Sequence, residues 1–316
     1  MDGLLIIDKS AGLTSHDVVA RVRRTLRTRR VGHTGTLDPF ATGVLVVVVE
    51  RATRLAQFLT TAVKEYEATV RFGYATDTGD CTGRRLDAPS AQDRVGESVL
   101  ALPESEIESA LSSLRGEIEQ VPPMYSAKKV QGKKLYELAR RGVEVVRAAA
   151  RVTIYELEAV QRGDHLLQSN EDGTQDLSIR VKCSAGTYVR TLAESIGERL
   201  GASAHLASLR RTRAGDFGIE EAIGLDELQE LADAGRVEER ILSPDAALSG
   251  LPFLHLTADE ARRALHGVAL GVRDGTNWPK DRPIRMLDAN GSLIAVGVYD
   301  SASHALRPRI VFSPEK

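Results

Sequence analysis

The sequence predicts an α+β protein with a β-rich C-terminal part, and three observations lead to this class. Apolar and polar residues alternate with a period of two in residues 65–72 and in 177–183, a pattern typical of half-buried antiparallel strands. A helix is predicted over residues 187–200, directly after the second of these strands. Beyond residue 252 most of the predicted elements are short strands. The body of the chain therefore combines sheet and helices, and the tail is mainly sheet.

The N-terminal elements are predicted from apolar spacing and capping residues. Residues 4–7 form a short apolar run typical of a buried strand. Either Thr14 or Ser15 can cap the helix that follows, because apolar residues then recur at a spacing of four on one face. The continuous apolar run 44–49 predicts a strand, and residues 52–62 predict a further helix.

The middle of the chain is predicted to be a helix followed by two strands. Ser105 and Glu108 have the spacing of a capping box, which predicts that a helix begins there. Residues 151–160 are expected to form the first of the two strands. The polar, acidic stretch 163–176 is expected to be an exposed hairpin extension, and Gly201 is expected to end the helix that follows the second strand.

The C-terminal part is predicted to be a separate small unit. Residues 242–252 have the composition of a linker. Thr257 and Glu260 form a second capping-box pattern after it. We therefore expect a catalytic domain over residues 1–247 and a small β-rich domain over residues 248–316.

Composition excludes several classes of protein. The chain has 316 residues, of which 27% are charged and 42% hydrophobic, so it can bury a core and is not disordered. The longest apolar run, Val44–Val49, is far too short to span a membrane, and the N-terminus lacks the features of a secretory signal. The two cysteines, Cys81 and Cys183, form no CxxC pair, which favours a reducing cytoplasm and disfavours structural zinc.

The charge distribution suggests a polyanionic ligand. The net charge is only −2. Residues 21–30 nevertheless hold six arginines and no acid, and residues 128–151 hold eight basic residues against two acidic ones. An acidic body with two basic segments indicates that a polyanion is bound at defined places, although solvated helix faces would give the same pattern.

The glycine-rich loop 32–43 is the densest candidate for a functional site. Its glycines allow tight turns and close approach of a ligand. Asp38 precedes Pro39, which favours an extended backbone, so the carboxylate projects from a stiff bend just before a core strand. An ordinary Asp-Pro turn is the structural alternative.

Arg190 is the second candidate, because it is a cation in the first turn of a predicted helix, where the helix dipole favours anions. It would be stable there if it paired with a carboxylate, and Asp38 is a candidate partner. An exposed arginine without a partner is the alternative.

Tyr66 and Tyr188 are either core residues or aromatic platforms for a nucleobase.

Other chemistry finds little support. Asp77 and Asp80 could bind a metal ion, but a turn is the simpler interpretation. The histidines lack metal-ligand spacing, so no metal is expected. The motifs of serine hydrolases, P-loop NTPases and dinucleotide-binding dehydrogenases do not occur in their proper context.

Residues 32–45, Gly-His-Thr-Gly-Thr-Leu-Asp-Pro-Phe-Ala-Thr-Gly-Val-Leu, closely resemble the catalytic motif of the TruB-type tRNA pseudouridine synthases, which act on uridine 55 of the T-loop. Further motifs resemble this family in the same order along the chain: Asp8-Lys9-x-x-Gly12-x-Thr14-Ser15, Lys64-x-Tyr66-x-Ala68, Pro122-Pro123-x-Tyr125-Ser126-Ala127, Gly132-x-x-Leu135-Tyr136, Cys183-Ser184-x-Gly186-Thr187-Tyr188-Val189-Arg190 and Leu209-Arg210-Arg211. Two departures are Ser10, where the family usually has proline, and the longer 163–176 segment.

The resemblance implies a pseudouridine synthase fold, with a large mixed, mainly antiparallel sheet flanked by helices, and a PUA-like RNA-binding domain at the C-terminus. It implies that Asp38 is the nucleophile, and attack on ribose C1′, attack on C6 of the base and removal of a sugar proton all remain open. It places Arg190 beside Asp38. It also places three residues around the base, namely Tyr66, Tyr188 and Leu209. The reaction detaches and rejoins a base, so no cofactor is expected.

The resemblance also implies how RNA is held. The uridine is flipped out of its stack. His33 inserts into the loop, and a basic thumb segment, residues 124–151, closes over the RNA. The lysines expected to contact RNA are Lys128, Lys129, Lys133 and Lys134.

The expected substrate is the T-stem-loop of tRNA. We expect a monomer without an obligatory protein partner or membrane contact, because the chain begins almost at the first motif, as in the stand-alone bacterial type. Three alternatives are a related synthase with another RNA target, a non-catalytic tRNA-folding chaperone that uses the same surface, and a metal-dependent phosphotransferase built on the glycine-rich loop.

Overall fold

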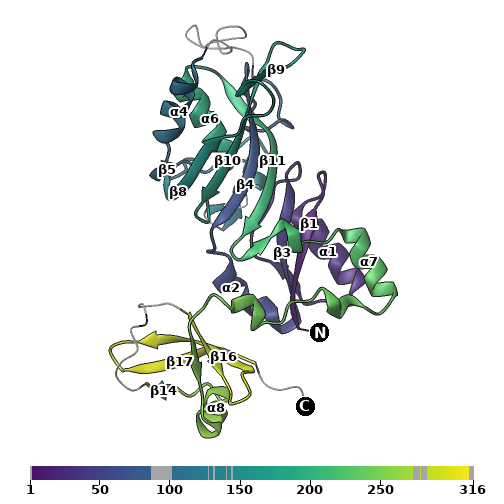
Figure 1. The fold of residues 1–316 in the computed structure, drawn as a ribbon, viewed down its shortest axis with the longest axis vertical. Helices are drawn as coiled ribbons and strands as arrows, with labels where there is room; N and C mark the ends of the chain where they lie inside the picture. The colour runs from purple at the N-terminus through teal and green to yellow at the C-terminus, as the bar shows by residue number, and fades with distance from the viewer. Residues whose placement is uncertain are drawn as a thin grey trace.

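The structure is a computed structural model that describes residues 2–86, 102–126, 128–130, 132–139, 141–143, 145–272, 278 and 283–312. Its elements form a large sheet with helices on both sides and, below it in Figure 1, a smaller sheet built from the C-terminal residues. In the described residues no helix is long and apolar enough to cross a bilayer.

Ten strands form the large sheet in the described part of the chain. Its neighbours pair antiparallel except β3 and β11, which pair in parallel through two residue pairs, Arg210 with Thr42 and Arg211 with Gly43. The sheet is therefore mixed and mainly antiparallel, which confirms the predicted class. The order along the sheet is β1 (Gly3–Lys9), β3 (Thr42–Val49), β11 (Ala204–Ala214), β4 (Lys64–Phe72), β10 (Gln175–Cys183), β8 (Ala150–Ala159) and β5 (Gly116–Gln120), with β2 (Val31–His33), β9 (Leu167–Ser169) and β12 (Phe217–Gly218) paired to β3, β10 and β11.

The N-terminal half of this sheet, β1 and β3, is buried on both faces. Alternate residues of the apolar run in β3 point to opposite sides, so each side receives its own set of valines. Helices α1 (Ser15–Thr25) and α7 (Leu225–Asp233) cover one side. The other side belongs to an apolar cluster that includes Ala52 and Leu55 and extends to Val296, Ile310 and Phe312 of the C-terminal sheet.

The second half of the sheet, β4, β10, β8 and β5, buries one face. In β4 the residues alternate between buried and partly exposed, as the period of two predicts. Helices α4 (Glu104–Ser112) and α6 (Val189–Leu200) pack on the apolar face (Figure 1). The opposite face carries ion pairs instead, such as Arg71 with Asp176 and Lys182 with Glu156.

The smaller sheet has the strand order β13 (Phe253–His255), β15 (Pro283–Leu287), β16 (Leu293–Asp300), β17 (Ala305–Val311) and β14 (Leu270–Gly271), and helix α8 (Ala258–Leu265) packs against it. Thr257 caps α8 with the predicted capping box. The remaining elements are η1 (Glu50–Leu55), α2 (Ala56–Leu59), β6 (Lys129–Val130), β7 (Lys133–Lys134), α5 (Leu135–Ala139), η2 (Ile219–Glu221), η3 (Val237–Glu239) and η4 (Ala246–Leu248).

Two local predictions are wrong. The helix expected to begin with a Ser105 capping box begins at Glu104, with Pro103 as its N-cap and no side-chain cap, so Ser105 lies inside the first turn. The helix expected over residues 52–62 is a 3-10 turn followed by a single α-helical turn, which ends at Leu59. At the other helix ends Thr14 is the N-cap of α1, with Asp17 completing a capping box, and Gly201 ends α6 in the left-handed conformation.

Candidate functional site

A cleft of about 260 Å³ lies where the two halves of the large sheet meet. Its walls come from the 32–43 loop, from β4 and β11, from the turn before α6, and from the start of the thumb segment. The cleft brings together five of the residues predicted from sequence, namely Asp38, Tyr66, Tyr188, Arg190 and Leu209.

The backbone around Asp38 is held by the first residue of α1 and the last residue of β1. The buried Ser15 hydroxyl accepts a hydrogen bond from the Leu37 N–H at 2.9 Å and donates one to the Leu37 carbonyl at 3.2 Å. On the other side of Asp38, the buried Lys9 ammonium donates to the Pro39 carbonyl at 3.2 Å. Both neighbours of Asp38 are therefore fixed, which gives its carboxylate a defined position.

Asp38 and Arg190 form the expected ion pair. Arg190 Nε lies 3.0 Å from Asp38 Oδ2, and Nη2 lies 3.2 Å from Oδ1, so the planar guanidinium contacts both carboxylate oxygens. The Arg190 side chain is only 4% exposed. A cation in the first turn of a helix is unfavourable by itself, and here several acceptors offset that cost.

Those acceptors come from distant parts of the chain. Arg190 Nη1 donates to the Thr78 carbonyl at 2.8 Å and lies 3.4 Å from a carboxylate oxygen of Asp80. Nη2 also donates to the Tyr125 carbonyl at 2.6 Å, at the beginning of the thumb segment. Arg190 is thus the point at which the 32–43 loop, the 76–80 turn and the thumb segment meet.

Burial and charge act in opposite directions on Asp38. Burial raises the pKa of the Asp38 carboxyl above its ordinary value, and the negative charge of Asp80 adds to this rise. The charge and the hydrogen bond of Arg190 lower the same pKa, as does the charge of Lys9. Arg190 is therefore the main group that favours the ionised form of Asp38 in this cleft.

Tyr66 lies on the buried face of β4, next to a second arginine. Arg211 is almost fully buried, and it donates from Nε to the Val44 carbonyl at 2.6 Å and from Nη2 to the Gly35 carbonyl at 3.1 Å. Burial raises the pKa of Tyr66, whereas the charge of Arg211 and its hydrogen bond to the phenol lower it. Arg211 thus ties the 32–43 loop to β3 and contacts the tyrosine at the bottom of the cleft.

Asp80 and Arg211 belong to the site, although sequence reasoning gave neither a role there. Asp80 was expected to lie in a turn, and it does, because its carboxylate accepts hydrogen bonds from Thr78 and Thr82. Its ion pair with Arg190 was not expected. Arg211 was noted only as part of a resembling motif. Neither residue has a local pattern in the sequence that marks it for the site.

His33 lies outside the set of residues that line the cleft, at the N-terminal side of the 32–43 loop. Its Nδ1 accepts a hydrogen bond from the Gly35 N–H at 3.3 Å, so Nε2 carries the proton. Its ring meets that of His16 edge to face, with 5.7 Å between centroids. Burial lowers the pKa of His33 to about 4, so this ring is neutral near pH 7.

The predicted RNA-binding lysines lie in the thumb segment. Lys128 is exposed. For Lys129, Lys133 and Lys134 the structure describes only the backbone, which forms the β6–β7 hairpin, so the prediction for their side chains lies outside the described residues.

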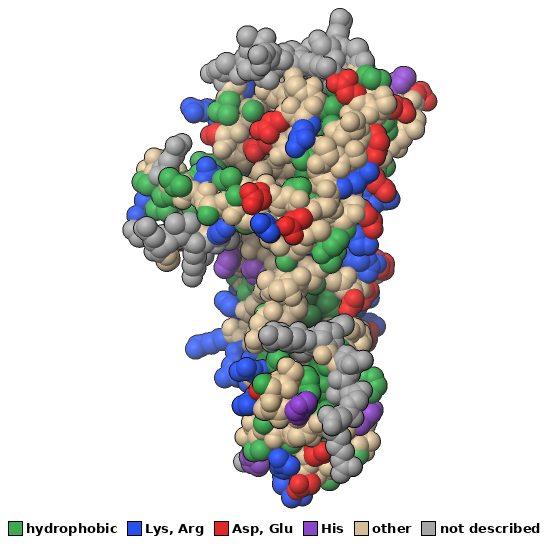
Figure 2. Space-filling model, turned by 90° about the vertical axis from the view of Figure 1, so that its left-hand side faces the viewer, with side chains coloured by type: hydrophobic (Ala, Val, Ile, Leu, Met, Phe, Trp, Pro, Cys, Tyr) green, Lys and Arg blue, Asp and Glu red, His purple; other side chains and the backbone are tan. Residues whose placement is uncertain are grey.

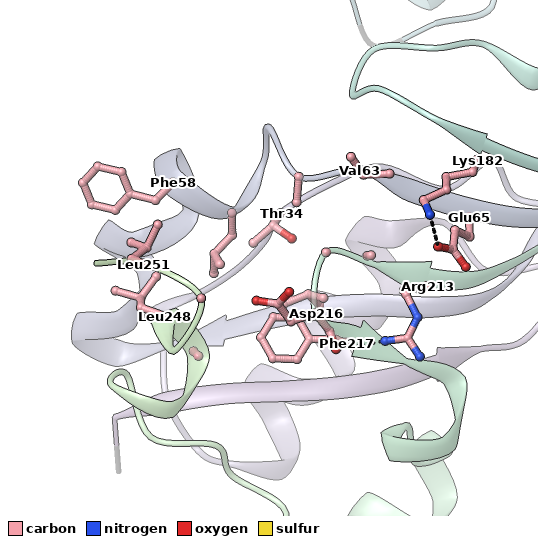
Figure 3. A pocket seen from close by; sticks show the side chains of 17 residues that line it. Thr34, Phe58, Val63, Glu65, Lys182, Arg213, Asp216, Phe217, Leu248 and Leu251 are labelled. Carbon is pink, nitrogen blue, oxygen red and sulfur yellow. Dashed lines mark hydrogen bonds and ion pairs between the residues drawn. The ribbon is translucent and has the colours of Figure 1, made fainter. Parts of the chain in front are cut away.

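A second cavity, of about 370 Å³, is shown in Figure 3. Phe58, Phe217 and Leu251 are among its apolar lining residues, and the ion pair between Glu65 and Lys182 lies at its edge. It contains none of the residues predicted for the site.

The described residues contain no group of three or more His, Cys, Asp or Glu side chains that could hold a metal ion. The chemistry available in the cleft is that of a carboxylate held by a guanidinium, beside aromatic and aliphatic walls.

Comparisons with known proteins identify the family of this chain. Residues 23–189 match the family described as TruB family pseudouridylate synthase, N-terminal domain, and residues 190–249 match the tRNA pseudouridylate synthase B C-terminal domain. The tRNA pseudouridine synthase B of Geobacter sulfurreducens is 43% identical over 99% of this chain and 100% of that protein. That of Geobacillus thermodenitrificans is 46% identical over 85% and 86%. Among solved structures, a chain in a Cbf5-Nop10-Gar1 complex is 27% identical with a TM-score of 0.74, covering 99% of this chain and 85% of that one.

Proposed function

This chain belongs to the TruB family of pseudouridylate synthases, which are isomerases, and on that premise we propose that it converts uridine 55 in the T-loop of tRNA to pseudouridine. The names of its relatives support tRNA as the substrate. The observation that carries the proposal is the Asp38–Arg190 ion pair, which holds one ionisable carboxylate in a cleft of about 260 Å³.

The proposed reaction balances without a co-reactant. The bond between ribose C1′ and uracil N1 breaks, a bond between C1′ and C5 forms, C5 loses its proton and N1 gains one. Asp38 serves as the nucleophile, and Arg190 keeps it ionised and oriented. No cofactor is required, because nothing is oxidised and no group is imported.

The walls of the cleft suit a detached base. Tyr66 and Leu209 are almost completely buried, and Tyr188 lines the cleft beside them. Aromatic and aliphatic walls of this kind can stack the uracil and exclude water, which would otherwise compete for the sugar.

We propose that the rest of the RNA is bound around this cleft. His33 takes the place of the flipped uridine, and the thumb segment contacts the backbone. Figure 2 shows Lys and Arg side chains gathered at one edge of the molecule, above the C-terminal sheet. In the 21–30 segment Arg21 is paired with Asp226 and Arg23 donates to the Val31 carbonyl. The exposed Arg24, Arg27, Arg29 and Arg30 are therefore the better phosphate contacts.

Three further parts of the proposal concern the oligomeric state, the cell compartment and the C-terminal domain. We propose that the protein acts as a monomer without an obligatory protein partner. We place this activity in the cytoplasm, where tRNA is available. The five-stranded C-terminal sheet supports the expectation that residues 248–316 are a PUA-like RNA-binding domain, distinct from the catalytic domain over residues 1–247.

The proposal is tested by incubating the protein with an unmodified tRNA transcript and mapping pseudouridine by position. We expect modification at uridine 55 alone, and none with Asp38→Asn, which keeps the shape of the side chain but removes the nucleophile. A variant that still binds tRNA but does not modify it supports the enzyme. Undiminished modification by Asp38→Asn would contradict the assignment, and refolding activity without any modified nucleoside would indicate a chaperone.

The thumb assignment has a separate test in salt. Replacing Lys128, Lys129, Lys133 and Lys134 with glutamine should weaken tRNA binding and flatten the dependence of log Kd on log salt concentration, by up to about 0.9 for each phosphate that the variant no longer binds. Lys182→Gln is the matched control, because Lys182 is already paired with Glu156 and Glu65. If the slope of log Kd against log salt concentration is the same in the quadruple variant, the proposed thumb contacts are refuted.

A further inference from the structure

Ser126 has a buried hydroxyl that the protein leaves unused. The residue is only 5% exposed, and its Oγ is shielded from solvent without a hydrogen-bond partner in the described part of the chain. Buried hydroxyls in proteins are almost always paired, so an orphaned one needs an explanation. Ser126 lines the same cleft as Asp38 and Arg190, which indicates that the missing partner is the bound substrate.

The backbone holds Ser126 at the Asp38 end of the cleft. The carbonyl of the preceding residue, Tyr125, accepts from Arg190 Nη2 at 2.6 Å, and the same nitrogen contacts Asp38 Oδ1 at 3.2 Å. On its other side, the Ser126 carbonyl accepts from the Tyr136 N–H at 3.1 Å. The backbone of Ser126 is therefore held on both sides, and the residue before it shares Arg190 with Asp38, the carboxylate at which sugar and base are joined in the proposed reaction.

A second serine in the cleft shows the contrast. The Ser184 hydroxyl oxygen accepts a hydrogen bond from the Thr153 N–H at 2.9 Å, so its hydroxyl already has a structural role. Both serines line the cleft, but only the hydroxyl of Ser126 lacks a partner among the described residues.

The chemistry of the reaction selects the sugar as the partner. The uracil must turn after it is detached, so a fixed hydrogen bond to the base would have to break during each turnover. The ribose stays joined to the RNA chain throughout, and a contact with it can persist from binding to release. The 2′-hydroxyl is the ribose group next to C1′ that can both donate and accept, as the serine hydroxyl can.

We propose that the Ser126 hydroxyl binds the 2′-hydroxyl of the target nucleotide, which makes it a residue that selects ribonucleotide over deoxyribonucleotide at this position. The inference rests on the proposed function, because it takes the target to be a nucleotide whose C1′ lies beside Asp38.

The test is a binding cycle with two T-arm stem-loop RNAs that differ only in having uridine or 2′-deoxyuridine at the target position. Kd is measured in an Asp38→Asn background, which prevents turnover, with Ser126, Ser126→Ala and Ser126→Thr. With Ser126 we expect the deoxy RNA to bind roughly three- to tenfold more weakly, as is typical when one neutral hydrogen bond is removed. Ser126→Ala should bind the two RNAs equally, and Ser126→Thr should restore part of the difference.

Ser184→Ala is the matched control, and its preference between the two RNAs should equal that of the unsubstituted serine protein. The thermal midpoint of Ser126→Ala should be unchanged or higher, because no hydrogen bond within the protein is removed. An equal preference in the Ser126 and Ser126→Ala proteins, or a lower thermal midpoint in Ser126→Ala, overturns the inference. Failure of this inference can be told apart from failure of the proposed function. The protein with Asp38 intact is incubated with the uridine RNA, and pseudouridine formation there tests the proposed function alone.

Discussion

The two halves of the large sheet are built on different principles. In β1 and β3 both faces are buried, one under α1 and α7 and the other in an apolar cluster that extends to the C-terminal sheet. In β4, β10 and β8 one face is buried under α4 and α6, and the other is open and charged. The site residues are divided between them, because Asp38 lies in the loop that leads into β3, whereas Tyr66 and Arg190 belong to the second half.

The two halves of the large sheet contribute different parts of the site. The doubly buried half is a rigid support for one carboxylate, and the half with one open face supplies the groups around it. Within the sheet the two halves are joined by a short parallel pairing, Arg210 with Thr42 and Arg211 with Gly43. The cleft is therefore a product of the junction, and substitutions that act across the junction should have the largest effects.

The largest effect is expected for the ion pair that crosses the junction. Arg190→Lys keeps the charge but cannot form the planar pairing with both oxygens of Asp38, so we expect kcat to fall by roughly 10²- to 10³-fold. Arg190→Met also removes the charge that lowers the pKa of Asp38, so that pKa rises further. Because the nucleophile must be ionised, the acidic limb of the kcat/KM profile should then move to higher pH. Near-normal turnover by Arg190→Lys would show that the planar pairing across the junction is not needed.

The next largest effect is expected at the junction itself. Gly43 has φ +99°, and a Cβ there would lie 2.2 Å from the backbone oxygen of Arg211. Gly43→Ala should therefore lower the free energy of unfolding by about 3 kcal/mol or more, through strain and overlap together. Gly173→Ala is the matched control, because its φ is +80° but nothing lies within 4 Å of the added carbon. Urea unfolding measures both, and an equal decrease in the two variants would show that the junction is not tight.

The smallest effects are expected for single substitutions on the two faces of β3 and of β4. Val46→Ala and Val47→Ala remove neighbouring side chains from opposite faces of β3, and each should cost about 2 kcal/mol or more of unfolding free energy. In β4 the same should hold for Val70→Ala, but Thr69→Ala, on the open face, should cost no more than about 1 kcal/mol. If the Thr69 variant is destabilised as much as the Val70 variant, the open face is not open in solution.

The period of two in β4 and β10 predicted both the strands and their buried faces. The run 44–49 predicted a buried strand, but a continuous apolar run does not say what covers either face. The cluster on one face of this strand extends to Val296 and Phe312, some 250 positions away in the sequence. The capping box at Ser105 failed because Pro103 already supplies an extended N-cap. The Asp38–Arg190 pair was predicted from a charge in an unfavourable place. The roles of Asp80, Arg211 and Ser126 depend on long-range contacts that leave no local pattern.

The four acceptors around Arg190 have a consequence for protein engineering. One guanidinium contacts Asp38, Asp80 and the carbonyls of Thr78 and Tyr125, which lie in three separate stretches of chain. A designer who transplanted the 32–43 loop alone into another scaffold would carry over the acid without the cation and the acceptors that position it. A working minimal site would have to be assembled from several discontinuous fragments, each with its own anchoring.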